Sequence, residues 1–245
     1  FWDGNEVWLI SAGGVTFAAF PQAYATMFSG LYSALMMLLF ALILRGVSFE
    51  FRGKVESITW KSLWDACQVV GSFLPALLLG VAFANIFKGL PINEAHVNTG
   101  GLLDLLNPYV LLGGVLFVAM FCMHGALWLN IRATGELKER AARAACGLWP
   151  AVLVLVLAFL AYSYVATQLF GNYFKNPHLF LILAGAVAGL LYSRLMLASG
   201  KAVNAWVGSA VFIACTTLFG VVGLFPAIIP SSLNPAWSLT IMNAS

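Results

Sequence analysis

Histidines are the residues of this chain best suited to bind a haem or another metal centre. There are three, of which His124 lies within an apolar run, whereas His96 and His178 lie in or beside predicted connections between such runs. An intramembrane histidine is a candidate functional residue, and with a methionine partner it could ligate a haem axially. A lone histidine is more often hydrogen-bonded to a neighbouring helix, so haem ligation by His124 is the less favoured alternative.

Two of the nine acidic residues, Asp3 and Glu6, stand at the start of a long apolar stretch. Their spacing is typical of a helix N-cap with a capping box, and the helix dipole favours acidic groups there by about 0.3–1 kcal/mol. Carboxylates at the mouth of a membrane bundle can also relay protons. Asp3 and Glu6 are therefore either helix-capping residues or candidates for a proton path.

Other chemistry finds little support in the sequence. The chain contains no glycine-rich phosphate loop, no His/Cys spacing for zinc and no nucleophile elbow. Its four cysteines lack the short spacing of metal or redox pairs, which favours small buried apolar side chains: Cys67, Cys122, Cys146 and Cys215. A net charge of +3 is too small to indicate a nucleic-acid partner. The sequence argues against a self-contained enzyme.

The composition indicates a membrane protein. Of 245 residues, 62% are hydrophobic and 9% are charged, and the mean hydropathy is +0.93. Soluble domains have about 25% charged and about 45–50% apolar residues. A fold of this size cannot bury so many apolar side chains from water, so lipid must surround many of them. We predict an all-α polytopic bundle of transmembrane helices that forms a single domain over residues 1–245.

A membrane-spanning helix needs about 20 mostly apolar residues. The chain offers seven such segments: residues 4–28, 30–49, 64–87, 109–131, 147–170, 178–198 and 205–229. The first two are predicted to form a tight hairpin, and Pro21 predicts a bend or a helix end. Gly185 and Gly189 have the small-xxx-small spacing of close helix contacts, which we attribute to packing within the chain.

Basic residues predict the orientation. Ten of the twelve fall in every second connection, and the positive-inside rule places those connections in the cytoplasm. The ten are Arg45, Arg52, Lys54, Lys61, Arg132, Lys138, Arg140, Arg143, Arg194 and Lys201. The N-terminal stretch with Asp3 and Glu6 is then also expected to be cytoplasmic.

Short motifs along the whole chain resemble, in the same order, subunit II of the cytochrome bd quinol oxidases. They are Asp3-Gly4-Asn5-Glu6-Val7-Trp8-Leu9, Gly13-Gly14, Phe17-Ala18-Ala19-Phe20-Pro21, Phe28-Ser29-Gly30, Arg45-Gly46-Val47-Ser48-Phe49-Glu50-Phe51-Arg52, Trp64-Asp65, Gly71-Ser72-Phe73, Gly80-Val81-Ala82-Phe83, Leu106-Asn107-Pro108, Thr134-Gly135-Glu136-Leu137, Phe225-Pro226, Pro230-Ser231-Ser232 and Asn243-Ala244-Ser245.

The resemblance implies a subunit of a respiratory quinol oxidase in the cytoplasmic membrane of a bacterium or archaeon. In that family a haem-bearing subunit I, with two haems b and one haem d, oxidises quinol and reduces dioxygen to water. Subunit II binds no haem and supports its partner. The family pattern has nine helices, so the chain is expected to be an excerpt that lacks the first and the last.

The resemblance also implies roles for individual residues. Asp3 matches a carboxylate of a cytoplasmic proton path at the subunit interface, and Trp8 matches a tryptophan near the hydrophobic route for oxygen. Lipid, a structural quinone and a small accessory subunit are further expected partners. Two alternatives remain open, namely a secondary transporter and a membrane anchor that binds haem through His124.

Overall fold

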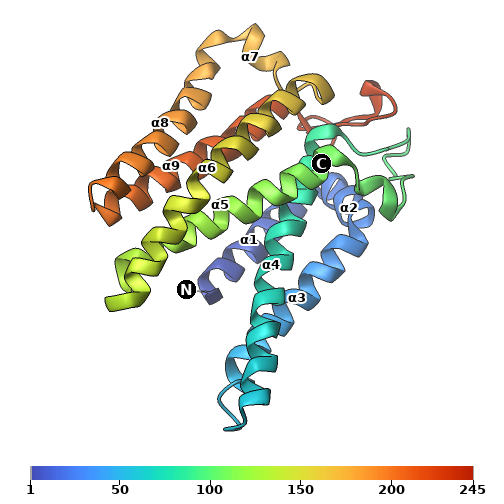
Figure 1. The fold of residues 1–245 in the computed structure, drawn as a ribbon. Coiled ribbons are helices and arrows are strands. Elements are labelled where there is room, and N and C mark those ends of the chain that lie inside the picture. Colours follow the sequence, from blue (N-terminus) through green and yellow to red (C-terminus); the bar gives the residue numbers. More distant parts are fainter. Residues whose placement is uncertain (1, 245) are drawn as a thin grey trace. The chain divides into compact units, whose positions relative to one another are not determined.

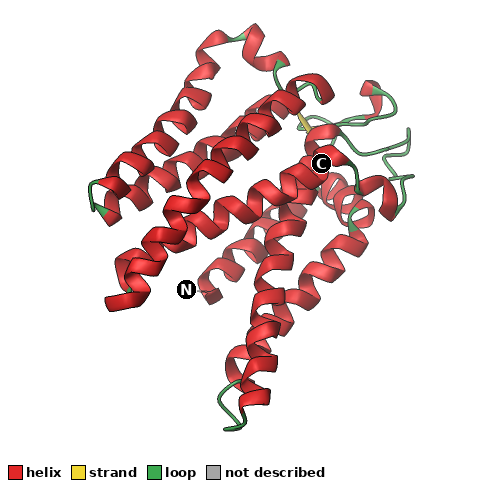
Figure 2. Cartoon of the chain, viewed as in Figure 1, coloured by secondary structure: helices red, strands yellow, loops and turns green. Residues whose placement is uncertain are grey.

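The computed structural model describes residues 2–244, without the side chains of residues 2, 3, 102 and 103. Within that range the chain forms nine α-helices (Figures 1 and 2). They are α1 (Trp2–Ala19), α2 (Pro21–Gly30), α3 (Tyr32–Phe51), α4 (Ile58–Lys88), α5 (Pro108–Arg132), α6 (Gly135–Ala166), α7 (Gly171–Lys175), α8 (Phe180–Ala198) and α9 (Ala202–Leu224). Short 3-10 turns, η1 (Leu102–Leu105), η2 (Pro177–Leu179) and η3 (Pro235–Trp237), and two strands, β1 (Ala227–Ile229) and β2 (Leu239–Thr240), complete the fold. The predicted all-α polytopic bundle is confirmed.

Six helical segments of the described chain are long and apolar enough to cross a membrane: α3, α4, α5, α6, η2 with α8, and α9. The first predicted span, residues 4–28, is instead two helices that meet at Phe20. Pro21 lacks an N–H group and disfavours helical backbone at the residue before it, and Phe20 accordingly adopts φ −140° and ψ 64°. Pro21 therefore marks a helix end, one of the two predicted outcomes, whereas the prediction of one continuous span over residues 4–28 is wrong.

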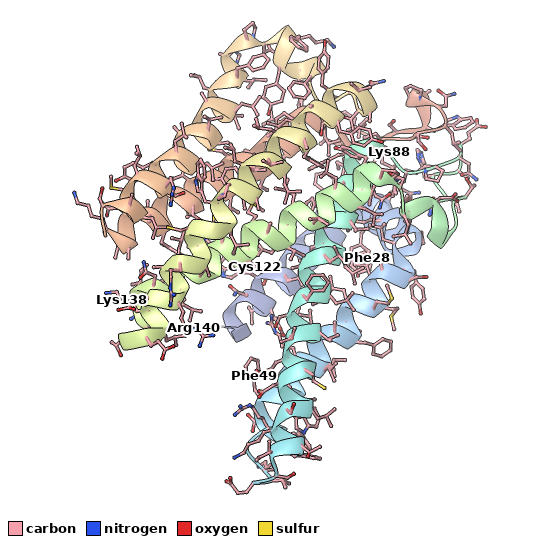
Figure 3. The ribbon with its side chains drawn as sticks, in the orientation of Figure 1. Phe28, Phe49, Lys88, Cys122, Lys138 and Arg140 are labelled. Atoms are coloured by element: carbon pink, nitrogen blue, oxygen red, sulfur yellow. The ribbon has the colours of Figure 1, made fainter. Side chains whose placement is uncertain are left out.

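Two helices extend well beyond their predicted spans. With 31 and 32 residues, α4 and α6 are about 45–50 Å long, whereas the hydrocarbon layer is about 30 Å thick. The additional turns of α6 carry charged side chains, including Lys138 and Arg140 (Figure 3). Hydropathy identified the apolar part of each helix and missed the polar turns that continue it.

The chain divides into two compact units, of which unit 1 comprises residues 1–107 and 224–245. Its α3 and α4 pack on each other through Ala34, Leu38 and Leu78. Gly71 of α4 lies so close to α3 that an added Cβ would come within 2.7 Å of the carbonyl oxygen of Ala41. Glycine is thus needed at position 71 for this helix contact.

Unit 1 also contains a cap in which the segments on either side of the α5–α9 region meet. Leu90 donates its N–H to the carbonyl of Pro230, and the Ser231 hydroxyl donates to the carbonyl of Ile92. Strands β1 and β2 pair antiparallel beside this contact. The buried core of the cap consists of Ala23, Leu31, Leu90, Ile92, Leu105, Ile229, Leu239 and Ala244. These contacts hold both segments against the end of α2.

Unit 2 comprises residues 108–223. Helices α8 and α9 approach at Gly189, where an added Cβ would come within 2.8 Å of the carbonyl oxygen of Gly208. An added Cβ at Gly185 would lie 3.0 Å from the sulfur of Cys215, also on α9. The prediction that the glycine pair of α8 serves packing within the chain is confirmed.

Buried hydroxyls of unit 2 are satisfied by neighbouring elements. Tyr109 of α5 shares a 2.9 Å hydrogen bond with Ser163 of α6, and Tyr173 of α7 donates to the carbonyl of Phe219. Burial raises the pKa of Tyr173 to about 12, because its phenolate would be poorly solvated there.

Candidate functional site at the start of the first helix

The acidic start of α1 is the first candidate. The side chain of Asp3 lies outside the described residues, but Glu6 is described and is 25% exposed. Its Oε1 accepts a 2.9 Å hydrogen bond from an Nη of Arg45, which is 20% exposed and lies on α3. Sequence reasoning proposed Glu6 as a capping or proton-path residue and did not foresee its ionic partner.

Trp8 lies on the surface of α1. Its side chain is 78% exposed, and the neighbouring Val7 and Ile10 are also exposed. An added Cβ at Gly13 or Gly14 would meet nothing within 4 Å. This face of α1 is apolar and is not covered by the described part of unit 1, so Trp8 is not a core residue of that unit.

His124 makes contacts within unit 2. Its Nδ1 is 2.7 Å from the hydroxyl oxygen of Ser209 on α9, and its ring lies 5.1 Å from that of Trp206, measured between centroids. Both contacts therefore join His124 of α5 to residues of α9. The arrangement matches the expectation for a histidine that is hydrogen-bonded to a neighbouring helix.

Among the described residues, no group of three or more His, Cys, Asp or Glu side chains is placed to hold a metal ion. Two cavities are formed by residues of unit 1, and His124 lines neither of them. One, of about 110 Å³, is lined by Ser29, Gly30, Tyr32, Ser33, Gly100, Gly101 and Leu105; the other, an open groove of about 520 Å³, is lined by Ile58, Thr59, Ser62, Leu63 and Ala66.

The four cysteines are unpaired, but none is fully buried. Cys122 is exposed and the other three are intermediate. Cys146 accepts a 3.0 Å hydrogen bond from an Nη of Arg194. The prediction of small buried apolar side chains is therefore wrong in its burial, because lipid-facing helix surfaces accept the thiol as readily as a core does.

The turn between α3 and α4 carries two further ion pairs that sequence reasoning did not single out. Arg52 binds both carboxylate oxygens of Asp65, the Nη2–Oδ2 distance being 3.0 Å, and Lys61 binds Glu56 at 2.7 Å. The hydrogen bonds that Arg52 donates to Asp65 raise the pKa of Arg52, and the hydrogen bond that Lys61 donates lowers the pKa of Glu56. Both pairs are at the solvent-exposed end of the hairpin, so they are surface contacts.

Comparison with known proteins identifies the family of this chain. The whole chain, residues 1–245, matches the family described as cytochrome bd terminal oxidase subunit II. The chain belongs to that family. It is 38% identical to cytochrome bd ubiquinol oxidase subunit 2 of Bacillus subtilis and 36% identical to cytochrome bd-I ubiquinol oxidase subunit 2 of Escherichia coli K12. Each alignment covers 100% of this chain, and 72% and 73% of those proteins, respectively.

The probable cytochrome oxidase subunit 2 of Haemophilus influenzae is 36% identical over 100% of the chain and 72% of its own length. The resemblance drawn from the motifs is confirmed, and a subunit II of the cytochrome bd type is favoured over a secondary transporter. Among the described residues of this subunit II, the ion pair between Glu6 of α1 and Arg45 of α3 is a contact that an apolar composition does not account for.

Proposed function

We propose that this chain is the subunit II of a quinol:oxygen oxidoreductase and that it supports a haem-bearing subunit I without carrying a redox centre. The family match over the whole chain is the observation that carries this proposal. The haems of the partner supply the electron transfer to oxygen. The packing of His124 on Ser209 and Trp206 supports a structural role for the one intramembrane histidine of α5.

The test is to purify the oxidase with full-length subunits and to record its optical spectrum. We expect the haem bands to be unchanged in His124→Ala, because the partner subunit would hold every haem. Loss of one set of bands in this variant, with the others retained, would overturn the proposal and restore the haem-anchor alternative. Ser11→Ala, at an exposed hydroxyl of α1, is the control for nonspecific effects.

We propose further that the basic connections face the cytoplasm and that Asp3 takes part in the uptake of protons that water formation consumes. An acidic group at the cytoplasmic mouth of a bundle is suited to this step. Moving one charge across the membrane is worth about 2.3 kcal/mol per 100 mV, so protons taken from the cytoplasm conserve energy. Glu6, three residues further along α1, accepts a hydrogen bond from Arg45.

Asp3→Asn in the assembled oxidase tests this assignment. Because positioned acid–base groups contribute at least about 100-fold to rates, we expect oxygen reduction to slow by at least about tenfold with normal haem content. Glu94→Gln, at an exposed carboxylate of the α4–α5 connection, is the matched control. Full activity of Asp3→Asn at every pH would remove Asp3 from the proton path.

Trp8 belongs to the same proposal as a residue beside the route of oxygen. Its exposed position on the apolar face of α1 supports a contact with lipid or with subunit I rather than with the core of unit 1. We expect Trp8→Ala to change the KM for oxygen while leaving kcat and haem content unchanged, and Trp8→Phe to keep the original KM. An unchanged KM in Trp8→Ala would exclude this role.

A structural quinone and a small accessory subunit remain proposed partners of the complex.

A further inference from the structure

The ion pair between Glu6 and Arg45 joins two helices whose paired residues are 39 positions apart in the sequence. The chain bends at Phe20, ends α2 at Gly30 and returns along α3, which brings Arg45 back to the start of α1. Both side chains are at least three-quarters buried within unit 1. Charges are costly in an apolar environment unless they are paired, so this contact is not an ordinary surface ion pair.

Arg45 makes two further contacts, one within α3 and one with α4. Its backbone carbonyl accepts a 2.6 Å hydrogen bond from the hydroxyl of Ser48. On α4, Gly71 lies against it, because an added Cβ there would come within 2.8 Å of the Arg45 Cβ. The residue therefore stands at a close contact of α3 and α4, and its guanidinium reaches from that contact to α1.

The guanidinium needs the acceptor oxygen that Glu6 provides. Arg45 Nε is buried and meets no acceptor among the described residues, so Glu6 supplies the acceptor that the structure describes for this group. An arginine keeps its charge at every working pH. Without an acceptor oxygen at position 6, the guanidinium would lose the hydrogen bond described for it, and the contact between α1 and α3 would weaken.

We propose that Arg45 and Glu6 are positioning residues, which fix the first turns of α1 against the α3–α4 pair, and that Glu6 acts as the acceptor for Arg45 instead of carrying protons. Asp3 lies one helical turn before Glu6, so the ion pair sets the place of the backbone that bears it. The consequence for catalysis rests on the proton-path role proposed for Asp3. The mechanical part, the attachment of α1 to α3, does not depend on that role.

Two substitutions of Glu6 separate positioning from proton transfer. Glu6→Gln keeps an oxygen that accepts from Arg45 but cannot carry a proton as a carboxylate does, whereas Glu6→Ala removes the acceptor. In the assembled oxidase with full-length subunits, we expect Glu6→Gln to retain oxygen reduction within about threefold and the original pH profile. We expect Glu6→Ala to lose about tenfold in kcat, equivalent to about 1.4 kcal/mol. Glu50→Ala, at an exposed carboxylate of α3, is the matched control and should keep full activity.

A second measurement follows the helix itself. Hydrogen exchange of the amides in the first three turns of α1 should accelerate in Glu6→Ala and in Arg45→Ala, and much less in Glu6→Gln. Gly71→Ala should also accelerate it, because the added methyl group displaces Arg45 without touching Glu6. Gly14→Ala, where an added Cβ meets nothing within 4 Å, should leave exchange unchanged.

The outcomes are distinguishable from those for Asp3. If Glu6→Gln is as inactive as Glu6→Ala, or shifts the pH profile, Glu6 carries protons and the inference is wrong. If exchange in α1 is unchanged in both Glu6→Ala and Arg45→Ala, the ion pair does not hold the helix and the inference is also wrong. If Asp3→Asn is fully active while α1 exchange rises in Glu6→Ala, the ion pair positions α1, and only the proton path through Asp3 fails.

Discussion

In unit 1 the contact between α1 and α3 is made by an ion pair, whereas the helices of unit 2 are joined by close glycine contacts and by hydrogen bonds of hydroxyl, imidazole and indole groups. All three described ion pairs lie in unit 1. In unit 2, Gly189 meets Gly208, and Trp149 donates to the carbonyl of Leu190. Charge costs more than a neutral hydrogen bond in an apolar environment. Only the Glu6–Arg45 pair is largely withdrawn from water, because the other two ion pairs are exposed. We expect the Glu6–Arg45 pair to position α1 and the neutral polar groups of unit 2 to be structural.

The largest effect that would test the packing of unit 2 is expected at Gly189. In Gly189→Ala the new methyl group would lie 2.8 Å from the carbonyl oxygen of Gly208 and 2.9 Å from the backbone nitrogen of Phe212, and neither backbone can move without separating α8 from α9. We expect a loss of about 3 kcal/mol in stability, as for severe overpacking. Thermal unfolding of the purified oxidase, followed by tryptophan fluorescence, measures it.

Gly125→Ala is the control for this variant, since an added Cβ on α5 meets nothing within 4 Å. It should unfold at or above the original temperature, because alanine favours helix over glycine by about 1 kcal/mol. If Gly189→Ala and Gly125→Ala unfold at the same temperature, the close approach of α8 and α9 is not what stabilises unit 2.

A smaller effect is expected at Ser209, which tests whether a polar group of unit 2 is structural. Ser209→Ala leaves the Nδ1 of His124 without its described partner, at a cost of about 1–2 kcal/mol. Oxygen reduction should keep its rate and its pH profile, whereas Asp3→Asn in unit 1 is expected to slow it. A shifted profile in Ser209→Ala would contradict the structural role of the polar groups in unit 2.

The fold was largely predictable from hydropathy, and its deviations have local physical causes. Segments 109–131 and 205–229 correspond to α5 and α9 because a membrane requires about 20 apolar residues in a row. The sequence gives no comparable signal for where a helix continues into water. Arg140 and its neighbours are good helix formers, so α6 begins twelve residues before its predicted span at 147.

The candidate site was predictable only in part. Asp3, Glu6 and Trp8 were identified by their place at the start of an apolar helix and by the family motif. The partner of Glu6 was not, because pairing with Arg45 depends on the bend at Phe20 and on the register of α1 against α3. A basic residue inside an otherwise apolar helix was the signal that could have prompted the search, since such a charge needs a partner.

A still smaller effect is expected at the exposed ion pair of the α3–α4 turn. Asp65→Asn removes the carboxylate that binds Arg52, but both side chains are about half exposed and water replaces the lost contact. We expect no measurable change in unfolding temperature at physiological salt and a slight decrease at low salt, where screening is weaker. A large decrease at both salt concentrations would mean that surface ion pairs, and not only the buried Glu6–Arg45 pair, hold unit 1 together.

The smallest effect is expected from Glu56, and its direction follows from its pKa. The hydrogen bond from Lys61 lowers the pKa of Glu56 below the ordinary value of 4.5, so the folded state holds this carboxylate ionised more strongly than the unfolded state does. The resulting stabilisation is complete above pH 4.5 and disappears as the pH falls through the lowered pKa. The difference in unfolding temperature between the original oxidase and Glu56→Gln should therefore shrink between pH 6 and about pH 3. A difference that grows on acidification would mean that Lys61 is not the partner that sets the charge of Glu56.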